Sequence, residues 1–353
     1  MLGILVEHTL QYPVLQPRGA LFAVYERSAP LFVLLAGAGL SLDMRPARPS
    51  RGRAMVLARV PLLMLIGMAL SIEVSGVILQ SFALFFLIGV SLAGLSQRVL
   101  AVVAGACLVG GPLLLAALRR AGELRGFGSQ EDVGFGALTE PLDLVRGLTL
   151  DFYPAVLWLG FFLVGMVLGR APLDAEGAGR RLFLGASAAA ALLLTIGWAG
   201  ARAFGPEPVA FGLAPSLPTT WSEHWTTYGF SEAVGWTLSA TALALAVVGG
   251  SVWLARSAGR MRPLLAPIAA LGAMSLSFSL LHFLYLDTLW ADVEPGLDDR
   301  AAFLLASIGF WLVFALAAQR WSRVLRRGPV ELVLHAVAAV VVRPGRGRAA
   351  VRS

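Results

Sequence analysis

The chain has 353 residues, of which 58% are hydrophobic and 14% are charged, and its mean hydropathy is +0.77. Soluble domains carry about a quarter charged residues, so this composition excludes an ordinary soluble enzyme. The formal net charge of +7 suggests nucleic acid as a partner at first sight, but the placement of the charges along the chain argues against it.

Ten apolar runs are candidate membrane-spanning helices, because about 20 apolar residues cross a hydrocarbon core of about 30 Å. In chain order they are residues 2–14, 20–42, 54–72, 75–95, 98–118, 153–169, 182–204, 232–255, 265–289 and 301–319. The first run is short by about one helical turn or more, so either the native chain begins upstream of Met1 or this helix does not fully span. The sequence predicts an all-α, polytopic membrane helix bundle.

The arginines orient this bundle. If the ten helices alternate in direction, 20 of the 28 arginines but only four of the 21 acidic residues fall on one side. Arginine-rich segments stay in the cytoplasm, so both chain ends are predicted to be cytoplasmic. Residues 1–320 then form the transmembrane domain, and residues 321–353 form a basic cytoplasmic tail that begins as a possible interfacial helix.

Two long loops, 119–152 and 205–231, are predicted on the outer side, and both are rich in Gly, Pro, acidic and aromatic residues. Loops of this length are uncommon unless they bind something or are disordered. The first contains LTEPLDLVRGLTLDFYPAVLW, which is expected to begin as a short amphipathic helix. Candidate substrate-binding residues are Asp151, Tyr153, His224 and Trp225. The alternative for the aromatic residues is a membrane-interface belt.

Ionisable side chains inside apolar runs or at their mouths are candidates for function, because a charge in hydrocarbon is costly. His8, Glu26 and Arg27 fall in the predicted outer half and are candidate catalytic residues. In SLSFSLLHFLYLD, His282 and Tyr285 share one helix face, which makes His282 a catalytic and Tyr285 a substrate-binding candidate. Two alternatives remain: the charges at the span mouth reach the interface, and His282 hydrogen-bonds between helices for packing.

The motifs that the sequence lacks exclude several classes of enzyme. The chain contains no P-loop, dinucleotide fingerprint, zinc-protease motif or nucleophile elbow, and its single histidines and one cysteine make no metal set. Two pairs of small residues, Gly37 with Ser41 and Ala106 with Gly110, predict close helix packing.

Five segments carry a family resemblance: LGILVEH, YERSAPLFVLLAGAGLSL, FYPAVLWLGFFLVGMVLGR, LLAPIAALGAMSLSFSLLHFL and RRGPVELVLH. Together they resemble bacterial multi-pass membrane proteins similar to heparan-alpha-glucosaminide N-acetyltransferase. They also resemble a related bacterial membrane family of unknown function whose members close on a Gly-Pro-[Leu/Val]-Glu motif. The Asp-x-x-Arg-Gly element that usually precedes LGILVEH is missing, as a native start upstream of Met1 would explain.

The resemblance implies transfer of an acyl group, acetyl in the namesake, from a CoA-type donor to a sugar or lipid-linked glycan across the plasma membrane. His8 best matches the histidine that acts as acid and base or as transient acyl carrier, and Arg27 stands where the family has a polar residue before PLF. Arg59, Arg98 and Arg262 on the inner side are candidates for the donor phosphates. The expected partners are the bilayer and the acceptor, with no metal and no nucleic acid.

A transporter or flippase for a lipid, sugar or organic acid is the alternative, because polar groups at an outer mouth and long loops suit it too. The two hypotheses predict different cavities. A tunnel from the inner arginines towards His8 or His282 favours acyl transfer, whereas a closed midplane cavity between two related halves favours transport.

Overall fold

The computed structural model describes residues 27–44, 49–72, 77–124, 134–151, 153–204, 218–227, 231–290 and 300–342. Regular structure within these ranges is entirely helical, which confirms the predicted all-α class. The candidates His8 and Glu26 lie outside the described residues.

The α-helices in chain order are α2 (Ser28–Asp43), α3 (Pro49–Leu57), α4 (Val60–Leu70), α5 (Leu79–Leu92), α6 (Gln97–Arg120), α7 (Pro141–Leu150), α8 (Ala155–Arg170), α9 (Ala178–Phe204), α10 (Val234–Ser257), α11 (Arg262–Ala273), α12 (Ser275–Trp290), α13 (Arg300–Ser322) and α14 (Pro329–Val341). Three 3-10 helices join them: η4 (Phe135–Leu138), η5 (Trp221–Trp225) and η6 (Gly259–Met261).

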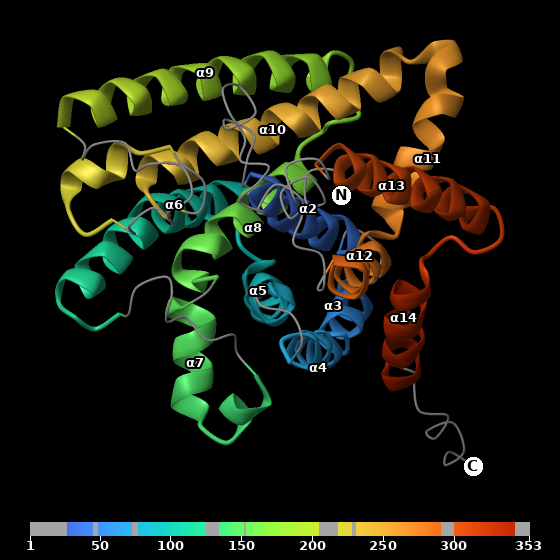
Figure 1. Ribbon diagram of the computed structural model, residues 1–353, viewed down its shortest axis with the longest axis horizontal. Helices are drawn as coiled ribbons and strands as arrows, with labels where there is room; N and C mark the ends of the chain where they lie inside the picture. Colours follow the sequence, from blue (N-terminus) through green and yellow to red (C-terminus); the bar gives the residue numbers. More distant parts are fainter. Residues whose placement is uncertain are drawn as a thin grey trace, which may run out of the picture.

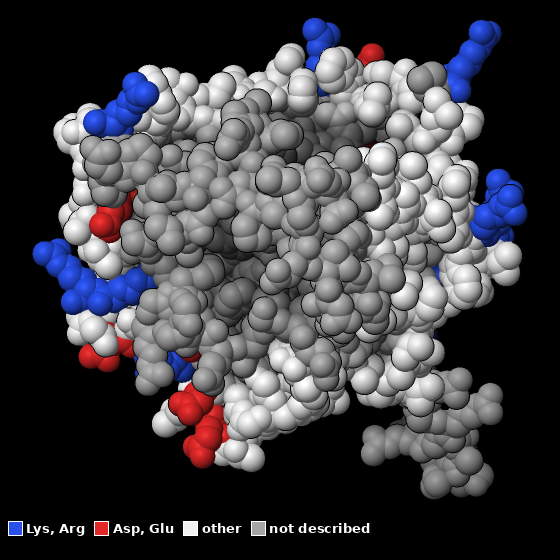
Figure 2. Space-filling model, viewed as in Figure 1, with Lys and Arg blue, Asp and Glu red and all other residues white. Residues whose placement is uncertain are grey.

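Several helices are long and apolar enough to cross a membrane. Within the described residues these are Ser50–Leu70, Gln97–Arg120, Ala178–Phe204 and Val234–Ser257. Two bent pairs, α7 with α8 and α11 with α12, bring the count to six if each is one span. In the view of Figure 2 the charged side chains that can be seen lie near the edges of the molecule.

The centre of the bundle is α8, which packs along both α2 and α6. Helix α10 runs beside α9 and also touches α2 and α6, while α3, α4 and α5 form a group on the opposite side of α8 (Figure 1). Helix α14 packs against α3 and α12, whereas α11 packs against α13 and α12 near the end of α10 (Figure 1). Fully buried aromatic side chains, among them Phe85, Phe162, Trp158 and Trp236, fill the space between these helices.

Small residues set the contact between α2 and α8. A Cβ atom on Gly37 would overlap the carbonyl of Phe162, and Ser41 Oγ donates a hydrogen bond of 2.9 Å to the carbonyl of Met166. The close helix packing predicted at Gly37 and Ser41 is confirmed. The prediction for Ala106 and Gly110 is wrong, because both are exposed and a Cβ on Gly110 would meet nothing within 4 Å.

The two ends of the bundle gather different loops. At the end where α8 and α10 finish, Arg170 donates hydrogen bonds to the carbonyls of Ala93 and Leu95, and Arg256 donates to the carbonyl of Ala175. Helices α2 and α10 begin at the opposite end, where α6 finishes. Following the predicted orientation, we call the first the inner end and the second the outer end.

Two segments differ from the sequence expectation. The predicted span 265–289 is bent by 80° where α11 meets α12 at Met274. Helix α14, which lies in the predicted cytoplasmic tail, packs against α12 and α3. A glutamate on α14 binds the start of α12 and so connects these two segments.

Candidate functional site

The outer end holds a group of buried polar side chains, which we call the outer polar cluster: Arg27, Arg119, His224, Glu232 and Ser239. They come from the start of α2, the end of α6, η5, the residues before α10, and the second turn of α10. Buried polar groups are expensive unless they are paired, so their convergence needs a physical explanation.

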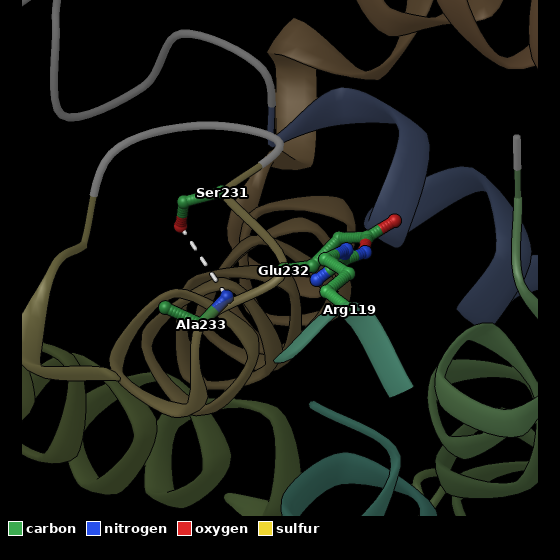
Figure 3. A network of polar contacts seen from close by, with 4 residues as sticks. All are labelled: Arg119, Ser231, Glu232 and Ala233. Atoms are coloured by element: carbon green, nitrogen blue, oxygen red, sulfur yellow. Dashed lines mark hydrogen bonds and ion pairs between the residues drawn. The ribbon is translucent and has the colours of Figure 1, made fainter. Parts of the chain in front are cut away.

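Arg119 and Glu232 form a buried ion pair (Figure 3). Their side chains are 5% and 3% exposed. Glu232 has a φ of 51°, a left-handed conformation that costs a non-glycine residue about 1–3 kcal/mol. The turn is held by Ser231, whose Oγ accepts a hydrogen bond of 3.4 Å from the Ala233 amide. The chain therefore turns sharply at the start of α10 and presents the carboxylate to α6.

Burial and the ion pair act in opposite directions on the Glu232 carboxyl. Burial raises the pKa of Glu232 to about 7, while the Arg119 guanidinium pulls it down. Two nitrogens of that guanidinium, Nε and Nη1, have no hydrogen-bond partner within the described part of the chain. The Arg119 side chain thus has N–H groups in the outer polar cluster that can still donate hydrogen bonds.

Arg27 ties α2 to α10. Its guanidinium donates hydrogen bonds of 3.0 Å to Ser239 Oγ and 2.6 Å to the carbonyl of Thr227. The side chain is 6% exposed, so it does not extend to the interface as the alternative interpretation required. Arg27 therefore fixes the segment after η5 against the start of the first described helix.

His224 lies in η5, which Glu223 begins by a reciprocal capping contact with Thr220. The imidazole is 8% exposed, and its Nδ1 has no hydrogen-bond partner among the described residues. Burial and the nearby Arg119 lower the pKa of His224, whereas Glu223 raises it. A histidine with this net shift is neutral at pH 7 and can accept a hydrogen bond.

The inner end opens into a cavity of about 500 Å³, which we call the inner cavity. Its wall on α2 extends from Phe32 to Asp43, which corresponds to about 17 Å along a helix. The remaining wall is largely apolar and includes Phe82 and Phe86 of α5 and Leu334 of α14. The cavity therefore follows α2 from its charged inner end to within about two turns of Arg27.

The mouth of the inner cavity is basic. Arg59 lies 3.7 Å from the Asp43 carboxylate, and its Nη2 is 3.2 Å from Nδ1 of His335 on α14. Burial together with the positive charges of Arg327 and Arg59 lowers the pKa of His335. Arg59 thus bridges the Asp43 carboxylate and the His335 imidazole.

Of the three inner arginines proposed from the sequence, the structure brings only Arg59 to this cavity. Arg98 starts α6 and Arg262 starts α11, and both are exposed and absent from the cavity wall. Arg327 and His335 were not singled out from the sequence. Arg327 follows the predicted span 301–319 by eight residues and resembles an ordinary orientation charge.

Glu331 was also missed, although it belongs to the Gly-Pro-Val-Glu motif. Its Oε1 accepts hydrogen bonds of 2.8 and 3.1 Å from the amides of Leu276 and Ser277, and Oε2 accepts one from Ser277 Oγ. These amides belong to the first turn of α12 and have no partner inside that helix. A Cβ on Gly328 would collide with Glu331 and Ser277. The motif therefore docks α14 onto the bend between α11 and α12.

This docking completes the inner cavity. Ser275 and Leu276 at the start of α12 and Leu334 on α14 all line it. The carboxylate at a helix N-terminus also interacts favourably with the helix dipole. Glu331 thus fixes the positions of α12 and α14, which form two walls of the cavity.

The other predicted site residues do not join either site. His282 is fully buried and stacks on Phe278, with ring centroids 5.9 Å apart. Tyr285 stacks on Phe310 of α13 at 4.2 Å. Tyr285 therefore contributes to an aromatic contact between α12 and α13, whereas His282 stacks on a ring of its own helix.

Three predicted substrate-binding residues lie at the outer end in other surroundings. Tyr153 packs edge-on against Trp158 at 4.8 Å, and Asp151 precedes it at the bend between α7 and α8. Trp225 fits against Gly200 of α9, where a Cβ would stand 2.5 Å from its ring. Trp225 is therefore a packing residue that holds η5 on α9.

The fold and these two sites define a multi-pass helical membrane protein with a basic-mouthed inner cavity and a buried polar cluster at the opposite end. Residues 6–202 match the family described as heparan-alpha-glucosaminide N-acetyltransferase, catalytic, and residues 178–340 match a family described as a protein of unknown function (DUF418). The first match covers more than half of the chain, which therefore belongs to this membrane acetyltransferase-like family. No curated protein and no solved structure matches it.

Helices from both matched regions of the chain line the inner cavity. Helices α2, α4 and α5 fall within residues 6–202, whereas α11, α12 and α14 fall within residues 178–340. The resemblance seen in the sequence is confirmed at the level of the family.

Proposed function

We propose that the protein is an acyltransferase of the bacterial plasma membrane that uses a CoA-type donor. The acyl group, acetyl in the namesake of the family, passes to a hydroxyl or amine of an envelope sugar or lipid-linked glycan. The observation that carries this proposal is the inner cavity, which extends from a basic mouth at the inner end to within about two turns of Arg27.

The residues of the inner cavity suit such a donor. Its volume of about 500 Å³ lies within the ~300–1,000 Å³ of small-molecule sites. Arg59 in the cavity wall can bind a phosphate group, and the apolar wall can accept an extended acyl-bearing arm. Arg98 and Arg262 have no part in the proposed donor site.

The chemistry needs a base near the acceptor. The donor supplies the acyl group as a thioester; the base takes the acceptor proton while the new C–O or C–N bond forms, the C–S bond breaks, and the proton passes to the thiolate. His282 does not line the inner cavity, so we assign this role to His8, with Glu26 as its orienting carboxylate. Arg27 positions the outer end of α2 beside the acceptor.

Transport, the alternative hypothesis, suits the cavity less well. The inner cavity opens beside a charged mouth and lies to one side of α8, between α2, α5, α12 and α14. A transporter predicts a midplane cavity between two related halves. The position of the cavity supports acyl transfer.

Donor kinetics test the proposal. Arg59→Gln should raise the donor KM about tenfold with little change in kcat, because a charged hydrogen bond contributes ~1.5–3 kcal/mol. Arg98→Gln removes an exposed inner arginine outside the cavity and is the matched control. Equal effects of the two substitutions, or no transfer from any acyl-CoA by the wild type, would contradict the proposal.

A further inference from the structure

A second cavity lies at the outer end of the bundle, and we call it the lateral cleft. Its volume is about 330 Å³. Helix α10 forms its floor with Val234 and Leu238, α6 and α9 form its two sides, and η5 closes it from above with Trp221 and His224. It is separate from the inner cavity, with which it shares no lining residue.

The sides of the lateral cleft are continuous with the surface that meets lipid. Val109 of α6 is 38% exposed and Ile196 of α9 is 42% exposed, and both belong to candidate membrane spans. Gly197 and Leu193 extend the apolar side on α9. An apolar cleft that opens sideways in a bilayer accommodates hydrocarbon rather than water.

The cleft also sits at a defined depth. On α10 its residues belong to the first two turns, and on α6 and α9 they belong to the second half of each helix. Each of these positions is nearer to the outer end than to the inner end. Under the predicted orientation, the occupant therefore comes from the outer leaflet.

The roof of the cleft supplies one polar group. His224 is 8% exposed and lines the cleft, and its Nδ1 has no hydrogen-bond partner among the described residues. The backbone around it is tightly held, because a Cβ on Gly235 would stand 3.1 Å or less from the carbonyls of three successive residues, His224 to Thr226. A buried nitrogen fixed in this way above an apolar cleft matches an amphiphile with its head beside η5.

We propose that the lateral cleft binds one hydrocarbon chain of an outer-leaflet lipid whose head group carries a free hydroxyl or amine, and that His224 accepts a hydrogen bond from that group. This assignment rests on the proposed function, for which it names a lipid-borne acceptor. Thr227, three residues after His224, is hydrogen-bonded to Arg27, so the head group lies on the segment that meets the outer end of α2.

Photolabelling of the full chain in vesicles tests this site without any acyl donor. The probes are phosphatidylglycerol, whose head group has free hydroxyls, and phosphatidylcholine, which has none, each with a diazirine near the middle of one acyl chain. We expect phosphatidylglycerol to label the 109–113 and 193–197 segments several-fold more strongly than phosphatidylcholine.

Two substitutions separate the parts of the claim. Val109→Trp fills the cleft and should abolish this labelling, while Val102→Trp, two turns earlier on the same face of α6 and 71% exposed, should preserve it. His224→Ala should reduce phosphatidylglycerol labelling to the level of phosphatidylcholine.

Equal labelling of the two tryptophan variants would overturn the cleft as a binding site. Equal labelling by the two lipids in the wild type would overturn the role of His224 and of a head group with a free donor. Because no donor is present, labelling with these properties alongside absent acyl transfer would reject the proposed function and leave the lipid site standing.

Discussion

The two ends of the bundle use arginine differently. At the outer end Arg27 and Arg119 are almost fully buried, and each is bound to a specific partner on α10 or just before it. At the inner end Arg170 and Arg256 bind backbone carbonyls at the surface and close the turns between helices. Arg59 at the mouth of the inner cavity is intermediate in exposure, with 26% of its side chain accessible.

This difference separates charges that report the orientation of the chain from charges that have a role in structure or chemistry. A charge in the aqueous interface can be gained or lost at small cost, so inner arginines report mainly the orientation of the chain. Burying a charge costs several kcal/mol unless the partner is well placed, so the outer arginines must be retained for structure or chemistry.

The largest expected effect comes from breaking the outer ion pair. Arg119→Ala leaves the Glu232 carboxyl buried without its partner and should lower the free energy of unfolding in detergent by about 3–5 kcal/mol. Arg120→Ala, the exposed neighbour on the same turn, is the control and should change it by less than about 0.5 kcal/mol.

A double substitution sharpens the interpretation. Arg119→Met combined with Glu232→Gln removes both charges and should recover much of the lost stability. If it recovers stability but not acyl transfer, the pair has a role beyond packing. Equal stability of the Arg119→Ala and Arg120→Ala variants would contradict the buried pair.

A smaller loss is expected at the carboxylate near the inner end. Glu331→Ala leaves the amides of Leu276 and Ser277 without their acceptor and should cost about 1–3 kcal/mol in the same unfolding measurement. Gly328→Ala should be comparably harmful, because its new methyl group collides with Glu331. The exposed Glu176 provides a matched control as Glu176→Ala.

The smallest effect is a pH dependence at His224. Because its pKa is lowered, the folded protein keeps this imidazole neutral, and it gains a proton only as the pH falls below about 6.5. Its charged surroundings are Glu223, Arg119 and, paired with the latter, Glu232. Phosphatidylglycerol labelling and stability should both fall with acidification in the wild type.

The His224→Gln variant provides the comparison. It keeps a hydrogen-bond acceptor but does not titrate, so its labelling should stay flat between pH 5 and pH 7.5. A parallel decline in both proteins would assign the pH dependence to another group.

The sequence predicted the class of the protein because hydropathy and charge act locally. Apolar runs and arginine counts need no knowledge of partners, so the helical membrane bundle follows from them. Gly37 with Ser41 was also predictable as a contact, whereas Ala106 with Gly110 was not. On α6 the close contact belongs to Gly111, one position along, where a Cβ would stand 2.5 Å from the carbonyl of Val156.

The pairings inside the sites were beyond a single sequence. Arg119 and Glu232 are 113 residues apart, and Glu331 binds amides 54 and 55 residues earlier. Nothing local to Glu331 indicates this role, since an acidic residue after Gly-Pro also fits the first turn of its own helix. Arg27 was singled out from the sequence as a charge at the mouth of an apolar run, but its hydrogen bond to Ser239 required the fold.

The proposed function depends on the inner cavity as the donor site, and filling this cavity tests it most directly. Gly39 lines the cavity, and a Cβ there would meet nothing within 4 Å, so Gly39→Phe places a ring in the cavity without a backbone collision. Gly105→Phe is the matched control, because Gly105 is exposed on α6 and equally unobstructed. The measurement is transfer of labelled acetyl from acetyl-CoA supplied to the cytoplasmic face of membrane vesicles.

We expect Gly39→Phe to lose at least ninety per cent (about tenfold) of the transfer seen in the wild type, and Gly105→Phe to retain it. Transfer that survives in Gly39→Phe at the level of Gly105→Phe would contradict the claim that the acyl donor occupies the inner cavity.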